Sequence, residues 1–270
     1  MLFDLAIIGF GVIGVETLNG IKKNLLLRKN KNKNKIKIAI IEKKLTNIPG
    51  GVAYSQESSK FGYFNNPLRL SHPDFIKWFN LKENRNNLIN FTKNNPDYNL
   101  NHWFKNHESI LKKNFKDYNE VYLPRLVYSF YLKEKIIEFL DVKKKLNISL
   151  KFYKGEVRIL NNENYYNIFS KKLFNEFNIR LNQKKFALKK HKLNFLHVIQ
   201  SKNVVIGTGI IPPKKIEEKI IKRNSNYIWD FYSSGGTNNL LKKINAISKI
   251  KKKIIIIFIG NKAGLLETMQ

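Results

Sequence analysis

The feature of this sequence that most constrains the fold is a glycine-rich turn between two apolar segments near the N-terminus. Residues 3–8 form a short apolar run, and residues 9–14 carry glycines in the spacing G-x-G-x-x-G. A helical pattern follows over 12–27, and a second apolar run covers 36–42. A strand, a glycine turn, a helix and a second strand in this order predict a βαβ unit with two parallel strands. We therefore expect an α/β protein built on a parallel sheet.

The residue types in this unit are those of a dinucleotide-binding turn. Gly9, Gly11 and Gly14 would let the backbone approach a pyrophosphate, and the helix N-terminus would offer N–H donors and a positive dipole end. Glu42 closes the second strand, where a carboxylate can accept hydrogen bonds from a ribose diol. It lies farther along the chain than the usual ~20 residues, because a lysine- and asparagine-rich loop intervenes at 28–35. The alternative is a purely structural tight turn, with a glutamate at a strand end by chance.

The order of the later segments favours FAD over NAD. NAD-binding domains usually continue through several βα units in quick succession. Here the second strand leads instead into a helical insertion at about 73–120, an amphipathic helix at 123–140 and a strand–glycine–strand segment at 148–160. We expect an antiparallel β meander over 164–200, and then a strand within 203–209 that ends in glycines. A late glycine-bearing strand that returns to the cofactor is typical of FAD-binding domains.

Six segments of the chain resemble one known family. They are IIGFGVIG, GGVAYS, FNNPLRLSHPDFIKWF, YLPRLVYSFYL, VVIGTGIIPP and YIWDFY, in this order over nearly the whole chain. The family is the FAD-NAD(P)-binding family that includes the bacterial FAD-dependent urate hydroxylases and aspartate N-monooxygenases, and the ornithine and lysine N-hydroxylases are more distantly similar. The series is specific for the family and not for a substrate. The resemblance implies a Rossmann-like FAD-binding domain with FAD as the cofactor.

The resemblance also implies a set of cofactor-binding residues. Gly9, Gly11 and Gly14 would hold the pyrophosphate of FAD, and Glu42 would bind the adenosine ribose. The other implied contacts are Tyr54 and Asn65 near the flavin or the substrate entrance, Arg125 near the flavin or a phosphate, Val157 against the adenine through its backbone, and Thr208 and Gly209 closing over the cofactor. Each of these residues also has a plainer alternative. Tyr54 could only pack against other side chains, Asn65 could cap a loop, and Arg125 could be a plain surface arginine. Val157 could be a core residue, and Thr208 and Gly209 could form an ordinary turn.

A second turn near the C-terminus is similar to the first. Residues 258–269 repeat the pattern of residues 7–18, but Lys262 and Leu265 take the places of the second and third glycines. A leucine adds bulk where a phosphate or close helix packing needs none. Binding of NAD(P)H at this second turn therefore stays open.

These patterns predict two parts in the chain. Residues 1–212 would form the FAD/NAD(P)-binding domain, and residues 213–270 a linker and the incomplete start of a second Rossmann-like unit. The apolar run at 254–259 would need a following helix and a returning strand to complete a βαβ unit. We therefore expect this sequence to be a fragment of a longer protein.

The leading functional hypothesis is an FAD-binding oxidoreductase, specifically an NAD(P)H-dependent flavin monooxygenase that acts on a small molecule in the cytoplasm. The alternatives are a non-catalytic FAD/NAD(P)-binding module or truncated remnant, and a basic nucleic-acid-binding protein. The formal net charge of +30 would suit the last of these. However, the lysines are spread along the chain and accompany abundant asparagine and isoleucine, as an A/T-rich coding sequence would produce.

The sequence also limits the chemistry. No catalytic acid or base can be named, and the five histidines show no metal-binding or triad spacing. There is no cysteine, which excludes thiol catalysis and Cys-ligated metals. No apolar run reaches the ~18 residues of a membrane span. The sequence determines neither the substrate, nor the choice between NADH and NADPH, nor the oligomeric state.

Overall fold

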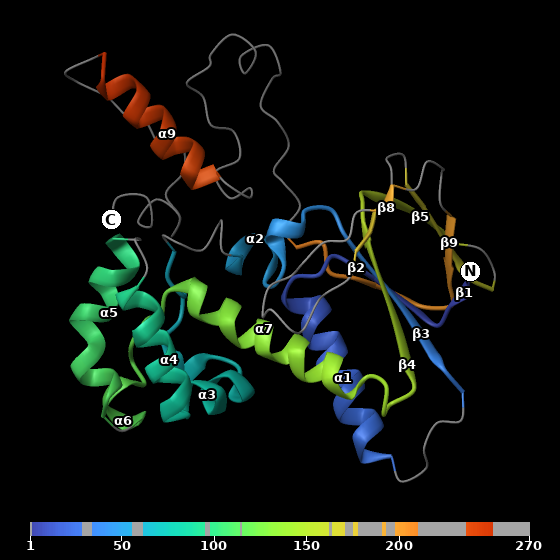
Figure 1. Cartoon of the computed structure of the whole chain (residues 1–270), viewed down its shortest axis with the longest axis horizontal. Coiled ribbons are helices and arrows are strands. Elements are labelled where there is room, and N and C mark those ends of the chain that lie inside the picture. The colour runs from blue at the N-terminus through green and yellow to red at the C-terminus, as the bar shows by residue number, and fades with distance from the viewer. Residues whose placement is uncertain are drawn as a thin grey trace. The chain divides into compact units, whose positions relative to one another are not determined.

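Figure 1 shows the chain as a computed structural model. The structure describes residues 2–28, 34–55, 62–94, 98–113, 115–161, 164–170, 175–177, 191–192, 198–209 and 236–250. The chain divides into two compact units, the first with residues 1–51 and 132–210 and the second with residues 52–131 and 211–270. The second glycine turn expected at 258–269 lies outside the described residues.

The first unit is built on two sheets. Its elements are β1 (Leu2–Phe3), β2 (Leu5–Ile8), α1 (Val12–Leu27), β3 (Ile36–Glu42), η1 (Leu45–Asn47), β4 (Ile148–Lys154), β5 (Val157–Asn161), β6 (Tyr166–Ser170), β7 (Asn175–Phe177), β8 (His191–Lys192), β9 (Val198–Ser201) and β10 (Val204–Ile206). The six-stranded sheet has the order β10-β2-β3-β4-β7-β8, in which the first four strands are parallel neighbours. The four-stranded sheet has the order β1-β9-β6-β5, in which β5, β6 and β9 are antiparallel. The predicted βαβ unit and the parallel sheet are confirmed. The described strands within 164–200 are antiparallel to their neighbours, as expected, but they do not form one continuous meander, because β6 and β9 lie in the four-stranded sheet and β7 and β8 in the six-stranded sheet.

Both faces of the six-stranded sheet are covered, which explains why β3 is apolar over almost its whole length. One face packs on the four-stranded sheet through Phe3, Ala6, Ile8, Ala39, Ile41, Tyr153, Ile168 and Ile199. On the other face, Gly14 in the first turn of α1 (blue in Figure 1) lies close to Ile7, whose Cγ2 would be 3.3 Å from a Cβ built on that glycine. Phe10 packs edge-on against Phe152, with ring centroids 5.8 Å apart.

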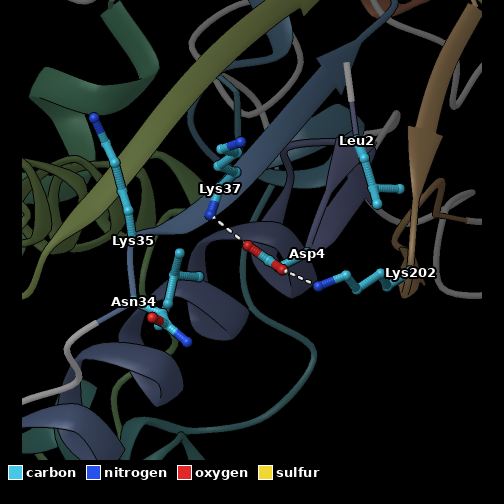
Figure 2. Close-up of a pocket in the computed structure, with 7 residues that line it drawn as sticks. Leu2, Asp4, Asn34, Lys35, Lys37 and Lys202 are labelled. Atoms are coloured by element: carbon cyan, nitrogen blue, oxygen red, sulfur yellow. Dashed lines mark hydrogen bonds and ion pairs between the residues drawn. The ribbon is translucent and has the colours of Figure 1, made fainter.

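Asp4 stands where the chain crosses between the two sheets. β1 lies in one sheet and β2 in the other, and β9 and β10 cross in the same way. The Asp4 carboxylate accepts a hydrogen bond from the backbone N–H of Lys37 (2.8 Å) and pairs with Lys202 (2.9 Å). Burial raises the pKa of Asp4, but the bonds from Lys202 and Lys37 outweigh burial and hold that pKa below its ordinary value. These residues line a hollow of about 360 Å³, shown in Figure 2, at the end of β2 that lies opposite the glycine turn.

Gly20 lies in the interior of α1 without a packing reason for being glycine. A Cβ built on it meets no heavy atom within 4 Å. We therefore predict that Gly20→Ala raises the free energy of unfolding by about 0.5–1 kcal/mol, because alanine restricts the unfolded chain and favours the helix. Urea unfolding checks this, with Gly14→Ala in the same helix as the control. The control must destabilise, because its Cβ would lie 2.7 Å from the carbonyl oxygen of Gly9.

A carboxylate joins α1 to α7 (Arg125–Val142), the helix whose second half belongs to the first unit. Glu138 on α7 pairs with Lys22 of α1 and, at 2.8 Å, with Lys135 of its own helix. Burial raises the pKa of Glu138, but the hydrogen bonds from Lys135 and Lys22 outweigh it, so that this pKa lies below its ordinary value of 4.5. A carboxylate with a lowered folded-state pKa stabilises the fold above its unfolded pKa, and that stability is lost as the pH falls through the folded pKa.

We predict that Glu138→Gln lowers the free energy of unfolding at pH 7 by about 1 kcal/mol, a figure reduced for partial solvent exposure. The deficit should shrink as the pH falls from 4.5 through the lowered pKa of folded Glu138, because the carboxylate becomes protonated first in the unfolded chain and then in the folded one. Urea unfolding over a pH series measures this. Glu120→Gln is the control, since its ion pair with Arg69 is exposed. A deficit that stays constant with pH would exclude the charge as the cause.

The second unit is mainly helical among its described residues. Its elements are η2 (Leu68–Leu70), α3 (Pro73–Asn80), α4 (Lys82–Lys93), α5 (Tyr98–Leu111), α6 (Phe115–Tyr118), the first turns of α7 and α9 (Gly236–Ser248), and α2 (Gly51–Tyr54) begins at the boundary of the two units. The helical insertion expected from the sequence is therefore present. α3 begins with Pro73 and Asp74, and the ring of His72 accepts a hydrogen bond from the Asp74 N–H (3.3 Å).

An aromatic core holds the second unit together. Its buried rings are Phe75, Trp78, Phe79, Tyr118, Tyr128 and Tyr131. Because the first two turns of α7 enter this core, Leu126 to Ser129 and Tyr131 are all buried. The prediction of an amphipathic helix is therefore wrong for the first two turns of α7, which are covered nearly all round.

Candidate functional site

The glycine turn, residues 9–14, lies where three parallel strands end together. The N–H of Gly9 donates to the carbonyl of Ile41 at the end of β3 (2.8 Å), and the N–H of Gly207 after β10 donates to the carbonyl of Ile8 at the end of β2 (2.8 Å). Gly9 has a φ of +91°, and a Cβ on it would lie 2.4 Å from the carbonyl oxygen of Gly207. Only glycine satisfies both conditions, so Gly9 is required for the backbones to meet here.

Gly11 and Gly51 form a second close backbone contact beside the first. A Cβ on Gly11 would lie 3.2 Å from the Cα of Gly51, and Gly51 itself has a φ of +67°. Gly14 has a different role, because its missing Cβ lets α1 pack against the turn and β2. The three glycines predicted from the sequence therefore lie together, and the glycine pair at 50–51 joins them. That pair had a signal in the sequence, the segment IPGG, but a proline next to two glycines is equally typical of an ordinary loop.

The N-terminus of α1 is open for an anion. Gly11 is the N-cap and has no side chain with which to cap the helix, and the first turn holds no acidic residue. The first helical bond joins the N–H of Val15 to the carbonyl of Gly11 (3.1 Å). The N–H groups of residues 12–14 therefore have no helical acceptor, and the positive end of the helix dipole adds to their attraction for a phosphate.

Glu42 lies against the glycine turn. It is 7% exposed, and its Oε2 accepts a hydrogen bond from the backbone N–H of Phe10 at 2.8 Å. Its Oε1 accepts a hydrogen bond from the N–H of Lys44 at 3.0 Å. Each oxygen of an ionised carboxylate has two lone-pair sites, so both can still accept a hydroxyl. This carboxylate therefore lies beside the glycine turn, as a ribose ligand predicted from the sequence should.

The other predicted residues of the first unit are near the same turn. Thr208 and Gly209 follow β10, and both are exposed. The N of Thr208 would lie 3.1 Å from a Cβ on Gly9, and Gly209 has a φ of +78°. Val157 begins β5, and its side chain packs against the core between the sheets. The N–H of Gly155 donates to the Glu42 carbonyl (3.0 Å), which ties the start of β5 to the Glu42 side of the site.

Tyr54, Asn65 and Arg125 belong to the second unit. Tyr54 and Arg125 both contact the segment 63–65, which contains Asn65. Arg125 donates from Nε to the carbonyl of Tyr63 (2.8 Å) and from Nη2 to Oδ1 of Asn65 (3.2 Å). The ring of Tyr54 packs on Phe64, with centroids 5.8 Å apart. Tyr54 and Phe64 are only half-buried, so they form an accessible rim of the aromatic core. A cofactor contact by these three residues stays a prediction.

We call the glycine turn, Glu42, the glycine pair at 50–51 and residues 207–209 the cradle. Three features of the cradle fit a dinucleotide. Its walls include glycine backbone at positions where a Cβ would intrude. The first N–H groups of α1, which have no helical acceptor, suit a phosphate, and the buried Glu42 carboxylate suits a ribose. Among the described residues, no group of three or more His, Asp or Glu side chains is placed to hold a metal ion. Within the same described part of the chain, no helix is both long and apolar enough to cross a membrane.

Comparisons with known proteins identify a family and several solved structures that match, one of which is described here. A family model described as FAD-NAD(P)-binding matches residues 6–170. A crystal structure of DfoA bound to FAD, the desferrioxamine biosynthetic pathway cadaverine monooxygenase from the fire blight pathogen Erwinia amylovora, is 13% identical, with a TM-score of 0.30. The match covers 97% of this chain and 56% of that one, so the chain spans little more than half the length of DfoA. No curated protein matches.

Proposed function

Because the chain belongs to the FAD-NAD(P)-binding family and FAD is its cofactor, we propose that the cradle holds the adenosine diphosphate part of FAD. One observation supports this most strongly. The buried Glu42 carboxylate is hydrogen-bonded to the backbone of the glycine turn, so the proposed ribose ligand and the proposed phosphate ligand are held together.

Each wall of the cradle has a distinct part in this proposal. The backbone of the glycine turn and the first N–H groups of α1 bind the pyrophosphate. The Glu42 carboxylate accepts hydrogen bonds from the ribose diol, while the N–H groups of Phe10 and Lys44 keep it in place. Thr208 and Gly209, at the end of β10, close the cradle on the side away from Glu42.

We propose further that the chain belongs to an oxidoreductase, and that the reaction is NAD(P)H-dependent hydroxylation of a small molecule. When bound, FAD supplies the redox chemistry. The residues proposed to act beside it are Tyr54 and Phe64, whose half-buried rings can exclude water, and Arg125, whose bonds to Tyr63 and Asn65 hold its guanidinium in one orientation. A non-catalytic FAD-binding module is the competing function.

The absorption spectrum of the purified chain tests the first part of this proposal. We expect the bands of oxidised flavin, either as purified or after addition of FAD and gel filtration. FMN, which lacks the adenosine half, should be lost on the same column. A chain that retains neither flavin would refute the proposal. Steady-state oxidation of NADH or NADPH by the FAD-loaded chain then separates an enzyme from a binding module, because only the enzyme consumes the nicotinamide.

A further inference from the structure

Positive charge gathers at the amino ends of the parallel strands, on the side of the first unit opposite the cradle. The helices α1 and α7 lead into β3 and β4, which are parallel neighbours, so both helices end at this edge of the sheet (Figure 1). The N–H of Ile36, at the start of β3, donates to the carbonyl of Asn147 in the turn before β4 (3.0 Å). We call the exposed basic side chains of these two connections and of the turn before β10 the amino-edge face, which consists of Arg28, Lys35, Lys37, Lys144, Lys145 and Lys202.

Most of the charge on this face has no acidic partner. Within the described residues, four of its members form no ion pair, namely Arg28, Lys35, Lys144 and Lys145. Lys202 pairs with Asp4 (2.9 Å), and the other acidic side chain in these segments is the exposed Asp141. Beside the face, burial and the neighbouring charge of Lys144 lower the pKa of Lys143 below its ordinary value of 10.5. Like charges held together in this way repel one another, and an anionic partner would relieve the repulsion.

Exposed leucines lie at the same edge of the sheet. Leu26 and Leu27, in the last turn of α1, are 51% and 81% exposed, and Leu2 is 41% exposed. Figure 2 shows Leu2 in the wall of the hollow that three lysines of the face also line. The described residues of these segments include no exposed aromatic ring, the side chain on which single-stranded nucleic acids stack. Leucines beside lysines are instead typical of proteins that bind the surface of an anionic bilayer.

We propose that the amino-edge face binds the surface of a membrane that contains anionic lipids. The leucines at the end of α1 would enter the boundary between headgroups and acyl chains, and the lysines would meet the anionic groups of the headgroups. This is contact with one surface of a bilayer and requires no membrane span. Because the cradle lies at the carboxyl ends of the same strands, it would face away from the bilayer.

Co-sedimentation of the full chain with lipid vesicles, at about 0.15 M salt, tests the proposal. The chain should bind vesicles of phosphatidylcholine and phosphatidylserine at least about tenfold more tightly than vesicles of phosphatidylcholine alone. The double variant Lys144→Gln and Lys145→Gln should lose roughly fivefold in affinity for each lysine removed. The matched control is Lys43→Gln with Lys154→Gln, which removes the same charge from exposed positions at the other ends of β3 and β4. An equal loss in both double variants would assign binding to the overall charge and overturn the proposal.

A second double variant, Leu26→Ser with Leu27→Ser, separates a lipid surface from a nucleic acid. Its affinity for the anionic vesicles should fall about tenfold or more, while its affinity for a single-stranded RNA oligonucleotide should not change. Its midpoint of urea unfolding should change little, because both leucines are exposed. Unchanged vesicle binding by this variant, or a wild-type chain that binds the RNA and not the vesicles, would overturn the proposal. Titration with FAD is read separately on the same proteins, so this result does not depend on the cradle.

Discussion

Replacing Gly9 by alanine should abolish FAD binding and lower the free energy of unfolding by about 3 kcal/mol or more. Two costs add at this position. A φ of +91° is strained for any residue with a Cβ, and that Cβ would overlap the carbonyl oxygen of Gly207 at 2.4 Å. The atoms nearest to this Cβ are backbone atoms of Gly207 and Thr208, directly after the paired strand β10, so they cannot move aside without disturbing the sheet. Urea unfolding and a titration with FAD measure the two effects.

A second variant keeps this prediction informative if Gly9→Ala does not fold. Gly11 has a φ of −82°, which alanine adopts without strain, and its Cβ would lie 3.2 Å from the Cα of Gly51. We expect Gly11→Ala to fold with a loss of about 1 kcal/mol, at the low end for overpacking, and to bind FAD more weakly than the wild type. Gly20→Ala controls for the substitution itself. If Gly9→Ala and Gly11→Ala both bound FAD as tightly as the wild type, the glycine turn would not be the phosphate site.

Replacing Glu42 by alanine should weaken FAD binding at least tenfold and lower the free energy of unfolding by about 2 kcal/mol. The loss of stability follows from the N–H of Phe10, a fully buried residue that would lose its acceptor. The N–H of Lys44 would also lose one, but Lys44 is exposed and water can replace it. The loss of affinity follows from the ribose diol, which would have no carboxylate to accept its hydrogen bonds.

Glu156→Gln is the matched control for Glu42. Glu156 is an exposed carboxylate of the same unit, and its pairing with Lys43 involves side chains that are both 61% exposed. Its substitution should change stability by less than about 0.5 kcal/mol and should leave FAD binding intact. The two responses of Glu42→Ala can also be compared with each other. Unchanged FAD affinity together with reduced stability would show that Glu42 only supports the turn, and the ribose contact would then have to be assigned elsewhere.

The elements around the cradle could be predicted because their signals are local. The bounds of α1 and β3 follow from apolar spacing and from the glycines between them, and they agree with the structure. The late strand β10 and the helix α3, with its N-terminal proline, were recognisable for the same reason. Such patterns act between residues a few positions apart, where the periods of helix and strand are fixed by backbone geometry.

The sequence was less informative where burial comes from distant segments. Its apolar spacing predicted an amphipathic α7, but the aromatic core of the second unit also covers the expected polar face over Leu126 to Ser129. The side-chain oxygen of Asn47, which is buried without a hydrogen-bond partner among the described residues, had no signal in the sequence at all, because asparagine in a loop next to proline and glycine is the expected composition of a turn. Only packing made it buried and unpaired.

By itself, the sequence determined the strand–turn–helix–strand order, the need for glycine at the turn and the presence of a carboxylate at the end of β3. The tertiary structure alone decided that Gly9 meets Gly207, that Gly11 meets Gly51 and that Glu42 accepts the N–H of Phe10. The physical reason is that the pairing of β10, β2 and β3 brings the first and third of these pairs together, and the loop after β3 brings Gly51 to Gly11. That pairing depends on the whole sheet closing around its core, and no local pattern of residues encodes it.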